Sequence, residues 1–139
     1  MSQKTSFRLD HVGIAVRDIA SRLRTYVDGL GLENTHSEEV PSEKVRVAFL
    51  PVGDTRLELL EPTDESSAVS AFIERRGEGI HHICIEVDDI EAALARLEQQ
   101  GTPLVDRTPR AGAEGSRVAF VHPRGTGGVL IELKEGKRG

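Results

Sequence analysis

Apolar and polar residues alternate with a period of two in two stretches of the chain, residues 8–16 and 80–87. This period is typical of a β-strand that buries one face. In the first stretch His11 shares a face with Gly13, and the aliphatic residues occupy the opposite face. In the second stretch His82 takes the corresponding position. Both stretches are therefore predicted to be strands that present one histidine on the less aliphatic face.

The two stretches belong to a long internal repeat. His82 follows His11 by 71 residues (82 − 11), and the same offset carries Arg46-Val47-Ala48-Phe49 onto the identical Arg117-Val118-Ala119-Phe120. Leu57-Glu58-Leu59 matches Ile131-Glu132-Leu133 at an offset of 74 (132 − 58), which three extra residues around 125–128 account for. A repeat of this length predicts two copies of one structural module. Each copy supplies one histidine on its first strand and one glutamate on its last.

The spacing of apolar residues between the repeated segments predicts the remaining helices and strands. After the first strand, Asp18 is an N-cap candidate for a helix that stops near Gly29. A second helix, expected at 64–79, has a cap near Ser66 or Ser67, and a third begins after Asp88 or Asp89. Further strands are expected at 32–37, 45–50, 55–60, 104–106, 117–122 and 129–134.

These elements predict an α+β fold class: a single domain over 1–139 built from two tandem βαβββ modules. The first module is expected at 8–62, the connecting helix at 63–79 and the second module at 80–135. A pseudo-twofold relation between the modules would form a cleft between mixed sheets, toward which both histidines and both glutamates point.

Composition narrows the class of protein. The 139 residues are 37% hydrophobic and 29% charged, which is ordinary for a globular chain. A formal net charge of −5 argues against nucleic-acid binding. No apolar run is long enough to span a bilayer, and the N-terminus lacks the apolar core of a signal peptide. The single cysteine, Cys84, favours a reducing, cytoplasmic compartment.

The repeated histidines and glutamates, His11, Glu58, His82 and Glu132, predict a metal site. Nitrogen and oxygen ligands without thiolate suit Co²⁺, Mn²⁺, Fe²⁺, Ni²⁺ or Zn²⁺ in a catalytic site, with coordination positions left for substrate oxygens. Taken singly, a strand histidine usually has a structural role and a strand glutamate is usually solvated. Because all four residues are matched pairwise by the repeat, metal binding is the favoured interpretation.

The remaining histidines and the cysteine are interpreted as surface, structural or packing residues. His81 falls on the other face of its strand and is left out of the site. His36 has no counterpart in the repeat and is interpreted as a surface residue, and His122 as a structural residue at the rim. Cys84 shares the face of His82 but has no activating cation nearby in sequence, which favours packing over nucleophilic chemistry.

Four segments of the sequence resemble a known family. Segments shared with it read LDHVGIAV, VAFLPVGDTRLELLEP, GIHHICIEVDDIEAAL and HPRGTGGVLIELKE. They resemble the methylmalonyl-CoA epimerases of the vicinal oxygen chelate superfamily, which also contains glyoxalase I and the extradiol dioxygenases. The resemblance spans Leu9 to about Glu135 and places the family's metal ligands on the same quartet. Some members have Gln where Glu58 stands.

The resemblance implies interconversion of (R)- and (S)-methylmalonyl-CoA through loss and return of the proton α to the thioester. Glu132 would then be a base as well as a ligand. Several relatives carry the second proton carrier as a Glu on the strand that contains Val47, where this chain has no carboxylate. Glu43, just before that strand, is the nearest candidate; Glu58, Cys84 or a metal-bound water are alternatives.

The implied partners are an acyl-CoA substrate and a second copy of the chain in a homodimer. The loop that contains Arg110, Ser116 and Arg117 offers positive charge for coenzyme A phosphates, although solvated arginines are an equal interpretation. Two alternative functions are compatible with the same four metal ligands or with the same fold. One is a glyoxalase I-type lactoylglutathione lyase that acts on a hemithioacetal. The other is a member of the superfamily that binds a small molecule without catalysis.

Overall fold

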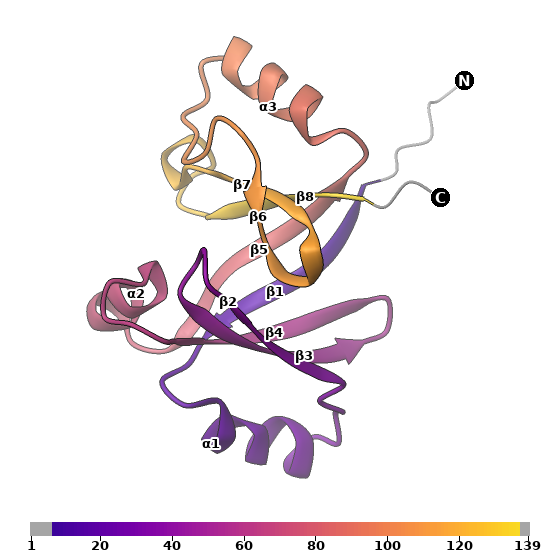
Figure 1. Ribbon diagram of the computed structural model, residues 1–139, viewed down its shortest axis with the longest axis vertical. Helices are drawn as coiled ribbons and strands as arrows, with labels where there is room; N and C mark the ends of the chain where they lie inside the picture. Colours follow the sequence, from indigo (N-terminus) through magenta and orange to yellow (C-terminus); the bar gives the residue numbers. More distant parts are fainter. Residues whose placement is uncertain (1–6, 137–139) are drawn as a thin grey trace. The chain divides into compact units, whose positions relative to one another are not determined.

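The computed structural model describes residues 7–136, which divide into two compact units (Figure 1). The N-terminal unit comprises His11–His82. The C-terminal unit comprises residues 7–10 and 83–136. Each unit contains a mixed sheet and a helix packed on it, so the predicted α+β class is confirmed. No helix within residues 7–136 has the length and hydrophobicity that a bilayer crossing requires.

The sheet of the N-terminal unit has the strand order β2-β3-β4-β1. Its strands are β1 (Arg8–Ala15, from His11 onward), β2 (His36–Val40), β3 (Val45–Val52) and β4 (Thr55–Pro62). β1 is parallel to β4, and the other pairs are antiparallel. One face packs against α1 (Ile19–Leu23) and the π-helical segment that follows it (Arg24–Gly29). α2 (Ala68–Arg76) begins at the predicted cap, Ser67.

The C-terminal unit repeats this plan. Its strand order is β5-β8-β7-β6, formed by β5 (Gly79–Val87, from Ile83 onward), β6 (Arg110–Ala111), β7 (Arg117–Val121) and β8 (Ile131–Glu135). β5 is parallel to β8. α3 (Ile90–Gln99) packs on one face, capped by the side chain of Asp89, and two short 3-10 turns lie at Ala113–Gly115 and Pro123–Gly125.

Strand register shows that the two glutamates are equivalent within their own units. In the first unit the Cα partners of Glu58 are Gly13 on β1 and Phe49 on β3. In the second unit the Cα partners of Glu132 are Cys84 on β5 and Phe120 on β7. Each pair of partners is separated by the repeat offset of 71 residues (84 − 13 and 120 − 49). The internal repeat in the sequence therefore corresponds to equivalent strand pairing in the two sheets.

The limits of several elements differ from the predictions. The strand expected at 32–37 lies at His36–Val40, because the acidic stretch there pairs with β3. The strand expected at 104–106 is reduced to a single bridge between Leu104 and Val121, and a short strand forms at Arg110–Ala111. The two-residue hairpin turn at Gly53 and Asp54 lies between the strands expected at 45–50 and 55–60.

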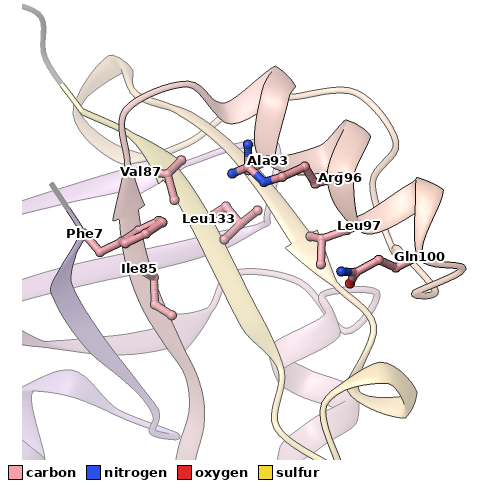
Figure 2. Close-up of a pocket in the computed structure, with 8 residues that line it drawn as sticks. All are labelled: Phe7, Ile85, Val87, Ala93, Arg96, Leu97, Gln100 and Leu133. Carbon is pink, nitrogen blue, oxygen red and sulfur yellow. The ribbon is translucent and has the colours of Figure 1, made fainter. Parts of the chain in front are cut away.

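The helix-covered face of the C-terminal unit contains a hydrophobic pocket of about 370 Å³ (Figure 2). It lies between α3 and the aliphatic side of β5 and β8, with Phe7 at one edge. Ala93 and Leu97 line it from the helix. At the repeat offset these positions correspond to Arg22 and Tyr26, and Tyr26 packs against the core of the N-terminal unit. Leu97 thus stands where the first copy has the larger Tyr26.

Candidate metal centre

Two histidines 71 residues apart meet inside the N-terminal unit. Nε2 of His11 lies 3.1 Å from Nε2 of His82, and the two rings are arranged edge to face. Both side chains are buried, with exposed fractions of 5% and 4%. Because a neutral imidazole carries one N–H and one lone pair, this arrangement directs two nitrogens at the same small volume. A cation or a shared proton can satisfy both.

Glu58 is the third member of this cluster. Its Oε2 atom lies 3.0 Å from Nδ1 of His11 and accepts a hydrogen bond of 3.0 Å from Nε of Arg56. The carboxylate is only 4% exposed, and a buried charge is stable only when it is paired and hydrogen-bonded. His11 and Glu58 are therefore paired within one unit, on the face opposite the aliphatic core.

Arg56 was missed by the sequence interpretation. Its guanidinium lies 4.5 Å from the centre of the Phe49 ring, a cation–π distance, while its Nε donates to Glu58. This contact fixes the same carboxylate oxygen that lies 3.0 Å from Nδ1 of His11. The available signal was the spacing: Arg56 precedes Glu58 by two residues on β4, so both side chains leave the strand on the same face.

The surroundings of His82 restrict its ring. A Cβ placed on Gly13 would lie 2.3 Å from Cε1 of His82, so any side chain at Gly13 would collide with the imidazole. On the other side, Nδ1 of His82 lies 2.9 Å from Nδ1 of His81. His81 in turn makes an edge-to-face contact with Phe72 of α2, with ring centres 5.1 Å apart. The prediction that left His81 outside the site overlooked this contact.

Glu132 lies in the C-terminal unit and is buried, with 6% of its surface exposed. Its cross-strand neighbour Phe120 carries the guanidinium of Arg110 at 5.2 Å from the ring centre. The N-terminal unit has the same arrangement around Glu58, where Phe49 carries Arg56. Each predicted glutamate ligand is thus accompanied by a phenylalanine and an arginine on its own sheet.

The predicted coenzyme A contacts have partners within the C-terminal unit. Nε of Arg110 lies 3.3 Å from a carboxylate oxygen of Asp106, and the hydroxyl of Ser116 donates to the backbone carbonyl of Ala113 at 2.7 Å. Arg117 donates to Glu91 and Glu135 at 2.8 and 2.9 Å, and these hydrogen bonds raise the pKa of its guanidinium. Phosphate binding by these residues stays a prediction.

Glu43, the predicted second proton carrier, lies in the turn between β2 and β3 and is partly buried. Its backbone carbonyl accepts a hydrogen bond of 3.2 Å from the hydroxyl of Ser67, which ties the turn to the start of α2. Val47 is 2% exposed. It lies two residues before Phe49, the cross-strand partner of Glu58, so the side chains of Val47 and Glu58 are on the same face of the sheet. The Val47 position on this face is therefore filled by a buried aliphatic side chain.

The histidine pair of the N-terminal unit fits a divalent transition metal. His11 and His82 present two imidazole nitrogens, which match the ligand preferences of Co²⁺, Mn²⁺, Ni²⁺ and Zn²⁺, and Glu58 contacts the other ring nitrogen of His11. Their shared burial excludes competing water, and Arg56 orients the carboxylate as an outer partner commonly does at metal sites.

The chain is similar to known proteins over most of its length. A family model described as Glyoxalase/Bleomycin resistance protein/Dioxygenase superfamily matches residues 10–120. The uncharacterized protein YqjC of Bacillus subtilis is 45% identical over 130 residues, which cover 94% of this chain and 93% of YqjC. An ethylmalonyl-CoA/methylmalonyl-CoA epimerase from Cereibacter sphaeroides is 40% identical over 130 residues, which cover 92% and 97% of the two chains.

A solved structure is similarly close. It is a variant of the Streptomyces coelicolor methylmalonyl-CoA epimerase in complex with 2-nitronate-propionyl-CoA. The TM-score is 0.87 at 38% identity, and the match covers 93% of this chain and 94% of that one. Similarity in sequence and in structure therefore extends over almost the whole chain.

Proposed function

Because the chain belongs to the Glyoxalase/Bleomycin resistance protein/Dioxygenase superfamily, we propose that it is an epimerase which interconverts (R)- and (S)-methylmalonyl-CoA. The observation that carries this proposal is the buried pair of His11 and His82, whose Nε2 atoms lie 3.1 Å apart, with Glu58 3.0 Å from Nδ1 of His11. The Cereibacter and Streptomyces epimerases support the choice of reaction within the superfamily.

The proposed metal ligands are His11, Glu58, His82 and Glu132. Glu132 is included because it occupies in the second module the register position that Glu58 occupies in the first. When bound, a divalent cation supplies the positive charge that offsets negative charge on the thioester as its α-proton leaves. Within the chain, Arg56 keeps Glu58 oriented and Gly13 keeps room for His82.

Two carboxylates carry the proton in this proposal. The Glu132 carboxylate removes the proton from the α-carbon on one face, and the Glu43 carboxyl group delivers a proton to the other face. In the reverse direction the two residues exchange roles, so no net proton is gained or lost. Delivery on the opposite face inverts the configuration at the α-carbon.

The coenzyme A part of the substrate is assigned to the loop that contains Arg110, Ser116 and Arg117. Its two guanidinium groups and its hydroxyl can bind phosphate oxygens. We also propose a homodimer in the cytoplasm, which is consistent with the family resemblance and with the single buried cysteine, Cys84. Light scattering on the purified protein tests the dimer.

The test of the activity is proton exchange. Purified protein is mixed with a single epimer of methylmalonyl-CoA in D₂O, and the α-hydrogen is followed by NMR while optical purity is followed by circular dichroism. The expected result is deuterium at the α-carbon together with loss of optical purity. An epimer that keeps both its hydrogen and its configuration would refute the proposal. Turnover of the hemithioacetal formed from methylglyoxal and glutathione would then favour a lactoylglutathione lyase.

A further inference from the structure

We infer that His81 is a positioning residue for the metal centre: its Nδ1 accepts the Nδ1–H of His82 and thereby leaves the Nε2 lone pair of His82 for the cation. The inference rests on the proposed function, because it presumes that His82 is a ligand. It adds a residue, and a proton position, to that site.

The proton position follows from the two contacts of the His82 ring. Nδ1 lies 2.9 Å from Nδ1 of His81, and Nε2 lies 3.1 Å from Nε2 of His11. A neutral imidazole carries its proton on only one of these nitrogens. If the proton is on Nε2, it points at His11 and blocks a cation from that atom. If His81 accepts the proton on Nδ1, the Nε2 atom carries a lone pair that is directed at His11.

The ring of His81 is itself held in place. It contacts Phe72 edge to face, with an angle of 80° between the planes, and Phe72 lies on α2, whose first turn is capped by Ser67. On the opposite side of His82, the bare Cα of Gly13 leaves no room for a side chain. His82 is therefore confined on one side by backbone and oriented on the other by a hydrogen-bonding partner.

The other histidine of the pair also has a partner on its second ring nitrogen. Nδ1 of His11 lies 3.0 Å from Oε2 of Glu58, so each histidine has a hydrogen-bond acceptor beside the nitrogen that faces away from the other ring. Histidines that bind metal ions commonly donate their second N–H to such a partner, and loss of the partner typically lowers metal affinity about 10- to 100-fold.

The test measures Zn²⁺ affinity by competition with a chromophoric chelator in wild-type protein, His81→Phe and His81→Asn. His81→Phe removes the acceptor, and the expected affinity falls about 10-fold or more. His81→Asn restores an acceptor, because the amide oxygen reaches the position of Nδ1, and affinity should recover to within a few fold. His36→Asn is the matched control, since His36 is half exposed and pairs with Glu38.

A measurement on wild-type protein covers the case in which a variant does not fold. With Zn²⁺ bound, NMR of ¹⁵N-histidine-labelled protein should show a proton on Nδ1 of His82 with a scalar coupling across the hydrogen bond to Nδ1 of His81. A proton on Nε2 of His82 would overturn the inference, as would equal Zn²⁺ affinity in His81→Phe and wild type. Either result leaves the proposed function standing, provided that wild-type protein binds Zn²⁺ and exchanges the α-proton of methylmalonyl-CoA. Failure of both wild-type properties removes the proposed function as well.

Discussion

Gly13 and His82 share a space that admits only one side chain. A Cβ on Gly13 would lie 2.3 Å from Cε1, 2.6 Å from Nδ1 and 2.8 Å from Nε2 of His82. These distances are far below van der Waals contact, and the obstacle is the face of a buried ring. The absence of a side chain at Gly13 is therefore a condition for the position of the imidazole.

Replacing Gly13 by valine should displace His82 and weaken the metal centre. We expect Zn²⁺ affinity to fall about 10-fold or more, because the ring can no longer direct Nε2 toward His11. Isothermal titration calorimetry measures the affinity, and a urea unfolding curve on the metal-free variant serves as the control for folding. Wild-type affinity in a folded Gly13→Val protein would show that the contact does not position the ligand.

Glu58 should tolerate exchange for glutamine but not for alanine. In Glu58→Gln the amide oxygen still offers a neutral oxygen donor, so we expect a modest loss of metal affinity. In Glu58→Ala the donor is lost and the guanidinium of Arg56 is left without the carboxylate that it contacts at 3.0 Å, so the loss should be on the order of 100-fold. Equal affinity of the two variants would contradict the assignment of Glu58 as a ligand.

Glu43→Gln should separate proton exchange from epimerisation. If Glu132 removes the proton on one face and Glu43 serves the other, the variant will exchange the α-hydrogen of one epimer for deuterium without inverting it. NMR in D₂O and circular dichroism, applied to both epimers, give the two rates. Unchanged epimerisation would assign the second proton transfer to another group, and Glu43 would lose its role.

The ion pair between Arg22 and Glu78 should make a pH-dependent contribution to stability. The Arg22 guanidinium donates to both carboxylate oxygens at 2.9 and 3.2 Å, and these bonds hold the pKa of Glu78 below its ordinary value of 4.5. A lowered folded-state pKa means that the contribution is complete above pH 4.5 and is lost as the pH falls through the folded-state pKa. Arg22→Gln should therefore lower the urea midpoint at pH 7 but have little effect once Glu78 is protonated.

Arg24→Gln is the matched control for this ion pair. Arg24 is exposed, and no carboxylate pairs with it among the residues that the structure describes. We expect this variant to follow the wild-type midpoint at every pH. A stability loss in Arg22→Gln that is the same at pH 7 and under acidic conditions would indicate lost packing instead of a lost ion pair.

The sequence predicted those parts of the site that depend on the alternation of side chains along a strand and on the internal repeat. Alternation placed His11 and Glu58 on the face opposite the aliphatic residues, and the core around Leu59 and Ile14 confirms that division. The repeat predicted equivalent positions for Glu58 and Glu132, and the strand register confirms them. These features could be predicted because side-chain direction in a strand has a fixed period.

Other parts of the site depend on contacts that no period encodes. Alternation sends His81 to the opposite face from His82, yet their Nδ1 atoms lie 2.9 Å apart. Arg56 was overlooked because an arginine in a strand next to a turn reads as a solvated residue, whereas its guanidinium packs on Phe49. The shift of β2 to His36–Val40 has a similar cause, since pairing with β3 overrides the low strand propensity of an acidic stretch.

The central claim is that the paired histidines and glutamates of the repeat bind one divalent cation. Equilibrium dialysis against Co²⁺, followed by elemental analysis, measures the bound metal in wild-type protein, in His11→Ala, in His82→Ala and in His36→Ala as a surface control. We predict one ion per chain in wild type and in His36→Ala, and a large loss in both other variants. Stoichiometric cobalt that persists without His11 or His82 would contradict the claim.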